Sequence, residues 1–200
     1  MTTAQAGKRE RTKQANREAI LLAAREVFSE IGYGAATVRD IVRRTDLATG
    51  TFYNYFPDKE SVLRALLDAI AVGARARVRE ARAAATTLEA FVADGFRAYF
   101  AFLAEDPQTV QLISRNAGTL RTLFDEPALG AGIVELREDL DTAIAAGRVP
   151  PHDTGLMAAA MVGAAVEVGL ATVAREPVDV DGAADFVTSV FVAAFERLDR

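Results

Sequence analysis

Residues 37–59 read TVRDIVRRTDLATGTFYNYFPDK and carry the strongest structural signal in the chain. Two short apolar runs within this stretch are separated by the turn residues Thr45-Asp46-Leu47. Their spacing predicts two short helices, over residues 38–44 and 48–55, joined by a tight turn. Such a pair, behind a longer supporting helix over residues 11–31, is a helix-turn-helix.

The second short helix carries small or hydrogen-bonding side chains on the face away from its apolar anchors Phe52 and Phe56. These residue types suit a DNA groove, because glycine permits close approach while hydroxyl and amide groups meet base edges or phosphates. A helix N-terminus and a lysine at the start of the next helix supply further phosphate contacts. The candidate DNA-binding residues are Thr37, Thr49, Gly50, Thr51, Tyr53, Asn54, Tyr55 and Lys59.

Two of these candidates, and a basic pair beside them, have plainer interpretations that the sequence leaves open. Gly50 could serve only packing inside the protein, and Tyr53 could be half-buried with a solvated hydroxyl. The basic pair Arg43-Arg44 fits either a phosphate contact or an ordinary solvated helix face.

Three motifs in this region occur with consistent spacing: FSEIGYG at residues 28–34, TVRDI at 37–41, and GTFYNYF at 50–56 followed by Asp58-Lys59-Glu60. Together they resemble the TetR (tetracycline repressor) family of bacterial transcriptional regulators. The resemblance implies a homodimer that contacts DNA through its recognition helix and releases it when a small molecule enters the C-terminal core. The chain departs from the family at Ala48, where many members have a capping serine worth about 0.5–2 kcal/mol.

Basic residues gather at the start of the chain. Residues 1–56 hold nine Lys or Arg and six Asp or Glu, a balance of +3, whereas residues 57–200 hold fourteen and twenty-two, a balance of −8. We expect the basic run at residues 8–13 to lack fixed structure without DNA and to follow the backbone or minor groove when bound. The change in composition predicts a domain boundary near Pro57. With the family resemblance, it implies a DNA-binding domain over residues 1–56 and an effector-binding and dimerisation domain over residues 57–200.

Apolar residues recur at helical spacing through the rest of the chain, without the alternation typical of strands. The pattern predicts an all-α protein of about nine helices. The family resemblance implies that a three-helix DNA-binding domain is followed by a helical ligand-binding and dimerisation domain. Six further helices are expected beyond the helix-turn-helix. The first covers residues 59–84, the second is capped by Thr86-Thr87 and ends near residue 105, and the third covers residues 107–116. The fourth ends at Gly147, the fifth is capped by Asp153, and the sixth is capped by Asp179 or Asp181.

Ten side chains of the second domain, most of them apolar, are candidates to line a largely apolar effector pocket with a few polar groups. They are Phe96, Tyr99, Phe100, Leu103, Leu112, Asn116, Phe124, Met157, Met161 and Glu167. The alternative is that these residues simply fill the core, as methionine often does. Glu167 has three interpretations: a pair with a buried arginine, a contact with a cationic ligand, or a place on a dimer surface.

Residues 154–174 carry one charge, on Glu167, and are long enough to cross a bilayer. Their Ala, Gly and Val content and the central carboxylate disfavour insertion, so we expect no membrane contact and a helix buried on nearly every side. Apolar residues on several faces of this helix and of the last one predict twofold pairing of four helices in a dimer, with a buried pair in a monomer as the alternative. The candidate interface residues are Val162, Val166, Leu170, Val187, Val190, Phe191, Ala194 and Phe195.

Cysteine is absent and histidine occurs once, at His152, so disulfide frameworks, thiol nucleophiles and multi-histidine metal sites are excluded. No nucleophile–base pair, P-loop or dinucleotide motif can be assembled, and we expect no cofactor and no enzyme activity. The start of the chain is no secretory signal, which predicts a cytoplasmic protein.

The predicted function is a DNA-binding repressor that binds a palindromic operator as a homodimer and responds to a largely apolar small molecule. Two alternatives come from other classes of protein. One is a helical protein–protein interaction module without sequence-specific DNA binding, and the other is an all-helical enzyme.

Overall fold

The structure, a computed structural model, describes residues 3–119 and 127–198. Throughout these residues the chain forms helices and connecting turns, with no strand, so the all-α prediction is confirmed. The helices with described bounds are α1 (Thr3–Ile31), α2 (Val38–Val42), α3 (Thr49–Phe52), α4 (Lys59–Ala83), α5 (Leu88–Glu105), α6 (Pro107–Arg115), α8 (Pro127–Ala145), α9 (Thr154–Val173) and α10 (Val180–Leu198).

The helices form two compact units. The first contains residues 3–69 and 111–119, and the second contains residues 70–110 and 127–198. The helix α4 therefore contributes to both units, and the end of α6 belongs to the first. The functional division between residues 56 and 57 stays a prediction.

The first helix is longer than its sequence pattern predicted. It begins at Thr3 rather than near Arg11, so the basic run that was expected to lack fixed structure is helical. The run consists largely of good helix formers. The Thr12 hydroxyl donates to the Lys8 carbonyl at 3.0 Å, and the Gln14 side-chain amide donates to Glu18 at 2.7 Å. The helix ends before Gly32, whose φ of +81° favours glycine.

Side-chain caps begin most of the later helices, as the sequence predicted. The Thr87 hydroxyl accepts from the Ala90 N–H at 3.1 Å, and the Asp153 carboxylate accepts from the Leu156 N–H at 2.9 Å. Asp179, rather than Asp181, caps α10 through the N–H of Gly182 at 2.9 Å. These bonds satisfy N–H groups that have no partner inside the helix.

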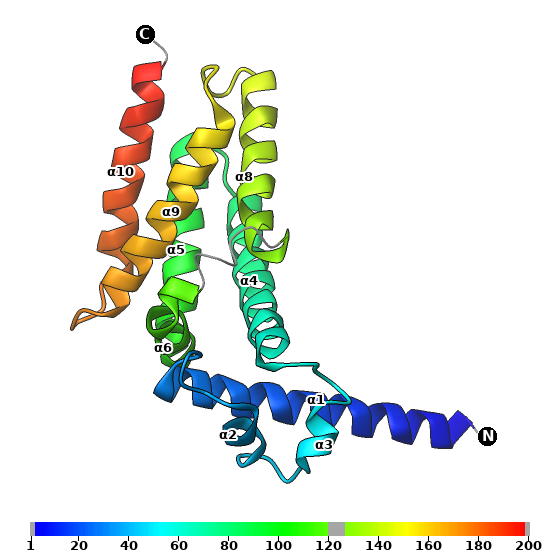
Figure 1. The fold of residues 1–200 in the computed structure, drawn as a ribbon. Helices are drawn as coiled ribbons and strands as arrows, with labels where there is room; N and C mark the ends of the chain where they lie inside the picture. The colour runs from blue at the N-terminus through cyan, green and yellow to red at the C-terminus, as the bar shows by residue number, and fades with distance from the viewer. Residues whose placement is uncertain (1–2, 120–126, 199–200) are drawn as a thin grey trace. The chain divides into compact units, whose positions relative to one another are not determined.

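In the first unit, α1 packs against α2, and α2 packs against α3. Figure 1 shows α2 and α3 lying on one side of α1. The two short helices are shorter than the predicted ranges 38–44 and 48–55. The large side chains that are fully buried in this unit are Ile20, Phe28, Ile41, Phe52, Leu63 and Leu112.

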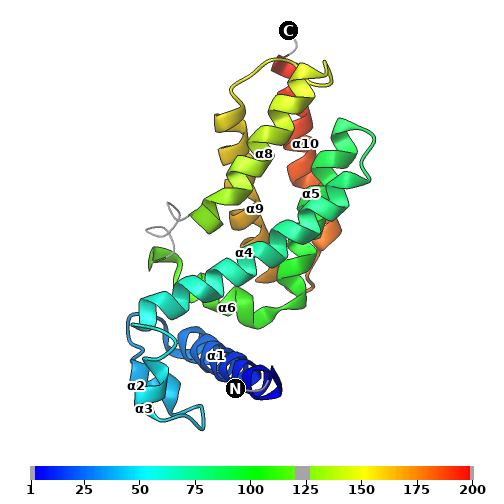
Figure 2. The same cartoon turned by 90° about the vertical axis from the view of Figure 1, so that its right-hand side faces the viewer.

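In the second unit, α5 packs against α9 and α10, and α8 packs against α9 (Figure 2). Gly169 permits close contact between α5 and α9, because an added Cβ would lie 2.8 Å from Leu103 Cδ1 and 3.0 Å from Phe100 Cδ1. The core of this unit is a continuous cluster of Val92, Phe96, Phe100, Leu136, Leu140, Val149, Ala158, Met161, Ala184, Val187, Phe191 and Phe195.

By length and composition α9 could cross a membrane, and 22% of its most apolar stretch is buried in the structure. The prediction that this helix is buried on nearly every side is therefore wrong for a single subunit. One stripe of the helix is exposed, and it consists of Leu156, Ala159, Ala160, Gly163, Glu167 and Ala171. Apart from Glu167, the residues of this stripe are apolar like those of the buried face, so the sequence pattern did not separate the two faces.

Candidate nucleic-acid interface

The recognition segment consists of the short helix α3 and the turn that follows it. No side chain caps this helix at Ala48, in agreement with the loss of a cap expected there. Beyond Phe52 the backbone continues in hydrogen-bonded turns, since the Tyr55 and Phe56 N–H groups both donate to the Phe52 carbonyl, at 2.9 and 3.0 Å. Pro57 then follows and has no N–H with which to continue the pattern.

Two buried rings anchor this segment. Phe52 is fully buried and Phe56 is 5% exposed, with 6.2 Å between their ring centroids. The Arg17 guanidinium, from α1, lies 5.3 Å from the centre of the Phe56 ring. The segment is therefore held from beneath, and its other face is left open.

The open face carries the predicted DNA-binding side chains. Thr49, Gly50 and Asn54 are exposed, and Tyr53 is 56% exposed. Thr51 is partly exposed. The Tyr53 ring also lies 5.3 Å from the Phe52 ring, so a half-buried tyrosine and a DNA contact both stay open for it. The residues expected to read DNA are brought together on one surface.

Gly50 has no structural reason to be glycine within the subunit. A Cβ added there would meet no atom within 4 Å, and its φ is not positive. The packing interpretation of this glycine is therefore wrong. The close approach of a base edge at Gly50 stays a prediction.

Tyr55 is tied to the supporting helix. Its hydroxyl accepts a hydrogen bond from the side-chain amide of Asn16 in α1, at 3.1 Å. The bond sets the position of the ring beside the N-terminal part of α1, and the tyrosine remains partly exposed.

Thr37 forms a capping box at the start of α2. Its hydroxyl donates to Asp40 Oδ2 at 2.5 Å and accepts from the Asp40 N–H at 3.2 Å, while the Thr37 N–H donates to the same carboxylate at 2.9 Å. The hydrogen bonds from Thr37 lower the pKa of Asp40. Thr37 is exposed and fixed in place, and its contact with a phosphate stays a prediction.

Lys59 has a structural role that the sequence did not reveal. Its ammonium group donates to the carbonyls of Tyr33 and Ala36, at 2.7 and 2.8 Å, and lies 4.4 Å from the centre of the Tyr33 ring. The lysine thereby joins the start of α4 to the loop between α1 and α2. Its predicted contact with a phosphate is untested.

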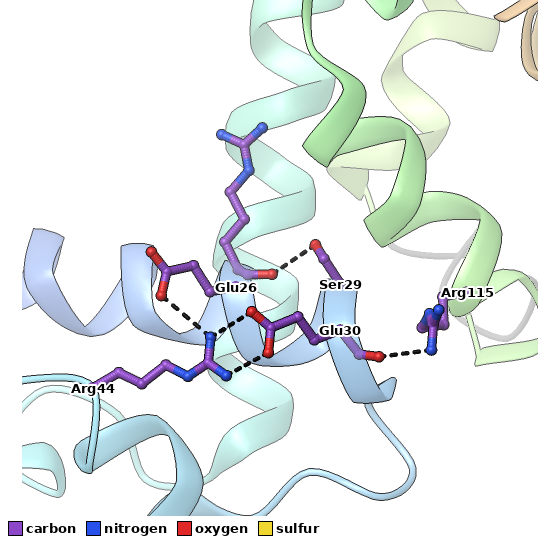
Figure 3. A network of polar contacts seen from close by, with 6 residues as sticks. Glu26, Ser29, Glu30, Arg44 and Arg115 are labelled. Atoms are coloured by element: carbon purple, nitrogen blue, oxygen red, sulfur yellow. Dashed lines mark hydrogen bonds and ion pairs between the residues drawn. The ribbon is translucent and has the colours of Figure 1, made fainter.

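Arg44 is also engaged inside the protein. Its guanidinium binds Glu26 at 3.3 Å and makes two bonds to Glu30, at 2.8 and 2.5 Å (Figure 3). The hydrogen bonds with Glu30 raise the pKa of Arg44 and lower that of Glu30. This network fastens the end of α2 to α1 at the protein surface, where Arg43 and Arg44 are both exposed.

The end of α6 is bound to the C-terminal end of α1. Asn116 accepts from the Tyr33 N–H at 2.6 Å and donates to the carbonyls of Phe28 and Leu112, at 3.2 and 2.7 Å. Arg115 donates to the Glu30 carbonyl at 2.6 Å, as Figure 3 shows. Asn116 was expected in the effector pocket. Its side chain instead forms the hydrogen bonds that join the end of α6 to the end of α1, segments far apart in the chain.

The other candidate pocket residues do not form one group. Leu112 belongs to the first unit with Asn116, Phe124 lies outside the described residues, and Glu167 is exposed on α9. The remainder lie in the second unit, where Phe96, Phe100, Leu103 and Met161 are buried and Tyr99 and Met157 are partly buried. Burial raises the pKa of Tyr99 to about 12.

A charged residue that the sequence analysis missed lies in the second unit. The Arg82 guanidinium packs over the Phe91 ring at 4.7 Å and lies so close to Gly95 that an added Cβ would be 2.6 Å from Arg82 Nε. Burial lowers the pKa of Arg82, and the charges of Asp139 and Glu135 oppose that shift. The only sign of this contact in the sequence is Gly95, thirteen residues after Arg82. A glycine at that distance is too weak a signal to predict the contact.

The candidate dimer residues divide between core and surface. Val187, Phe191 and Phe195 are buried in the core of their own subunit, which corrects their assignment to an interface. Val190 is 50% exposed, while Val162, Val166, Leu170 and Ala194 are partly exposed. The sequence analysis missed two residues with larger exposed apolar surfaces, Leu156 at 71% and Phe186 at 63%.

Known proteins are similar to this chain in sequence and in fold. Residues 20–66 match the model of the bacterial regulatory proteins of the tetR family. The chain is 30% identical over 142 residues to the transcriptional repressor AcnR of Corynebacterium efficiens, covering 71% of this chain and 69% of that protein. It is also 30% identical over 150 residues to the repressor KstR2 of Rhodococcus jostii, covering 66% and 74%. The structure of the fatty acid degradation regulator FadR from Bacillus halodurans aligns with a TM-score of 0.75 at 26% identity, covering 87% and 93%.

The fold and the recognition segment, together with the matched family, define a helix-turn-helix, DNA-binding transcriptional regulator. The chain belongs to the TetR family. The interaction-module and enzyme alternatives are therefore not favoured.

Proposed function

We propose that this protein is a cytoplasmic repressor that binds a palindromic operator as a homodimer and leaves it when a largely apolar small molecule binds the second unit. The observation that carries the proposal is the exposed face of the recognition segment, which presents Thr49, Gly50, Tyr53 and Asn54 above the buried ring of Phe52. A rigid base and an open polar face are what insertion into a major groove requires.

The proposed DNA contacts divide by chemistry. Thr49, Gly50, Thr51 and Asn54 are expected to meet base edges, since they are small or carry hydrogen-bonding groups on the open face. Thr37, Tyr53 and Tyr55 are expected to reach phosphates and set the docking angle.

Operator binding is tested by selecting sequences from a random duplex pool with the purified protein, then measuring affinity by fluorescence anisotropy. We expect a palindromic site, and we expect Asn54→Ala to weaken its binding by about 5- to 150-fold, the equivalent of about 1–3 kcal/mol for a base contact. The control is Gln111→Ala, another exposed polar residue of the first unit. Equal affinity of the two variants would contradict the assignment of α3.

The exposed stripes of α9 and α10 support the proposed dimer. Leu156 on α9 and Phe186 and Val190 on α10 expose large apolar surfaces, and Gly163 offers open space for a neighbouring backbone. Exposed apolar surface of this kind marks association sites. A dimer would also present two recognition helices, which can span half-sites about 34 Å apart.

The dimer is tested by sedimentation equilibrium. We expect the protein at micromolar concentration to have twice the mass of the 21.4 kDa chain. Phe186→Glu should produce the monomer, whereas Val134→Glu, at a position of similar exposure on α8, should not. A monomeric wild-type protein would overturn the dimer.

The effector is proposed as a class only. The second unit has an aromatic core that includes Phe96 and Phe100, with Tyr99 packed against it, and the similar FadR of Bacillus halodurans is a regulator of fatty acid degradation. Fatty acids are therefore the first candidates to test. Because α4 runs through both units, a shift of this helix would link the second unit to the recognition segment.

The release step is tested by titrating octanoate, palmitate and stearate into the operator complex. We expect one of them to lower operator affinity and to raise the thermal midpoint of the free protein. A ligand that stabilises the protein at saturation but leaves operator affinity unchanged would contradict the coupling, while DNA binding itself would stand.

A further inference from the structure

Arg82, near the end of α4, is a largely buried cation for which the second unit supplies no acceptor. Its Nε is enclosed by the protein and has no hydrogen-bond partner. Within residues 3–119 and 127–198, no carboxylate forms an ion pair with this guanidinium. A buried N–H without an acceptor is unfavourable, and more so when it belongs to a charged group. The contacts around Arg82 therefore decide whether this side chain serves packing or binding.

The guanidinium presents one edge to α5. A Cβ added at Gly95 would lie 2.6 Å from Nε and 3.0 Å from Nη2, but 3.2 Å from Cζ. These two nitrogens, rather than the flat face, are therefore turned toward Gly95, and an α-carbon is no hydrogen-bond acceptor. The Phe91 ring, 4.7 Å away, stabilises the positive charge through its face. The protein thus holds the cation in place and leaves its hydrogen bonds unmade.

Two carboxylates of α8 act on Arg82 through their charge without serving as its acceptors. Glu135 is bound to Arg75 at 3.4 Å, and Asp139 is exposed. Burial lowers the pKa of Arg82, and the charges of Asp139 and Glu135 oppose that shift. Because an arginine stays protonated in a protein, the guanidinium remains a charged donor that an anion from outside the chain can occupy.

A second donor without a partner lies one turn along the same face of α5. Tyr99 follows Gly95 by four residues, which places it about 6 Å further along the helix on the same side. Its hydroxyl makes no hydrogen bond to the described part of the chain, while its ring packs against the apolar core. Burial raises the pKa of Tyr99 to about 12, so the hydroxyl keeps its proton at neutral pH and remains a donor.

We infer that Arg82 binds the carboxylate of an amphiphilic acid whose hydrocarbon part lies along the apolar surface beside Tyr99. The inference rests on the proposed function, and it narrows the effector from a largely apolar molecule to one with a negative charge at one end. A carboxylate suits Arg82 because its two oxygens match two parallel N–H groups of a guanidinium, and the terminal nitrogens are not enclosed as Nε is. The partly exposed side chains that pack around the core, among them Phe91, Ile133 and Met157, suit a hydrocarbon chain.

Arg82→Gln and Arg79→Gln form a matched pair of variants that tests the inference. Each removes one arginine from α4, but Arg79 is exposed. A third variant, Arg82→Lys, keeps the charge and loses the two parallel donors. Binding to the DNA-free protein is measured by calorimetry with octanoate, dodecanoate and palmitate, each beside the alcohol of the same chain length.

The wild type should bind at least one of the acids more tightly than its alcohol. Arg82→Gln should weaken that binding by about 10- to 150-fold, as expected for a charge-assisted hydrogen bond, and leave alcohol binding unchanged. Arg79→Gln should bind the acid like the wild type, and Arg82→Lys should fall between the two. Asp139→Asn should strengthen acid binding by about 2- to 5-fold, because it removes a negative charge that acts on the same guanidinium.

Three results would overturn the inference: no binding of any of the three acids, equal affinity of the wild type for acid and alcohol, or equal acid affinity in Arg82→Gln and Arg79→Gln. A purely structural role of Arg82 would weaken acid and alcohol by the same factor in Arg82→Gln, which would overturn it as well. An acid that binds through Arg82 without lowering operator affinity would refute the proposed release step and support the inference. Because these measurements use no DNA, failure of the wild type to select an operator would refute only the proposed function.

Discussion

Gly50→Ala should make the protein more stable and its DNA binding weaker. The added methyl group meets no atom within 4 Å in the subunit, and the backbone at this position has no positive φ. Alanine in place of a helical glycine should therefore raise the free energy of unfolding by about 0.5–1 kcal/mol. For a chain of this length that corresponds to a rise of about 1–4 °C in the thermal midpoint.

The same methyl group points into the space that a base edge is proposed to occupy. Forcing an extra methyl group into a closely packed contact costs about 1–3 kcal/mol, so operator affinity should fall by about 5- to 150-fold. Opposite changes in stability and affinity would exclude misfolding as the cause of the loss.

The assay combines urea unfolding, followed by circular dichroism, with anisotropy on a labelled operator. Gly118→Ala is the control, because Gly118 is another exposed glycine of the first unit with open space at its Cβ position. We expect this control to bind the operator like the wild type. Wild-type affinity in Gly50→Ala would refute the close approach of DNA at this position.

Three further changes test contacts within the subunit by urea unfolding. Lys59→Met should lower stability by about 1–3 kcal/mol, because it leaves two partly buried carbonyls without their charged donor, and an unchanged midpoint would contradict that role. Gly169→Ala should lower the free energy of unfolding by about 1–3 kcal/mol through overpacking of α9 against α5. Gly132→Ala on α8 should stabilise the protein, because an added Cβ there meets its nearest atom at 3.7 Å. Equal effects of the two substitutions would contradict the close contact at Gly169. The hydrogen bonds from Thr37 lower the pKa of Asp40 below its ordinary value of 3.8. The ionised Asp40 carboxylate therefore contributes its full stabilisation above pH 3.8, and this stabilisation is lost as the pH falls through the lower folded-state pKa. Asp40→Asn should flatten the dependence of stability on pH below about 4. Parallel curves for the two proteins would count against this account.

Local signals in the sequence predicted local structure well. The caps at Thr37, Thr87 and Asp153 were identified, and Asp179 was one of two candidates, because a capping side chain acts on backbone groups two or three residues away. The buried anchors of the recognition segment followed from helical spacing for the same reason. Information of this kind lies within one turn of the chain.

Contacts between distant segments could not be predicted in the same way. Asn116 binds the end of α1 across more than eighty residues, and Lys59 binds loop carbonyls more than twenty residues away. Nothing in the composition around either residue distinguishes these partners from water or a phosphate. The sequence therefore identified both as polar residues of interest and assigned them the wrong or an incomplete role.

The apolar faces of α9 and α10 show a second limit. Val187 and Val190 are similar side chains three residues apart, yet the first is buried and the second is half exposed. When a helix is apolar on several faces, its period no longer indicates which face meets the core. The packing of α5 and α9 settles that question in the structure, and it leaves Phe186 on the surface.

The recognition segment depends on tertiary anchors for its order. A helix of four residues without a side-chain cap is not stable alone, because helix formation requires a costly nucleus. Its order must come from the buried ring of Phe52, from Phe56 under Arg17, and from the Asn16–Tyr55 hydrogen bond. Two of these three anchors come from α1, at Arg17 and Asn16. The placement of the recognition segment therefore depends on α1, the helix that supports it.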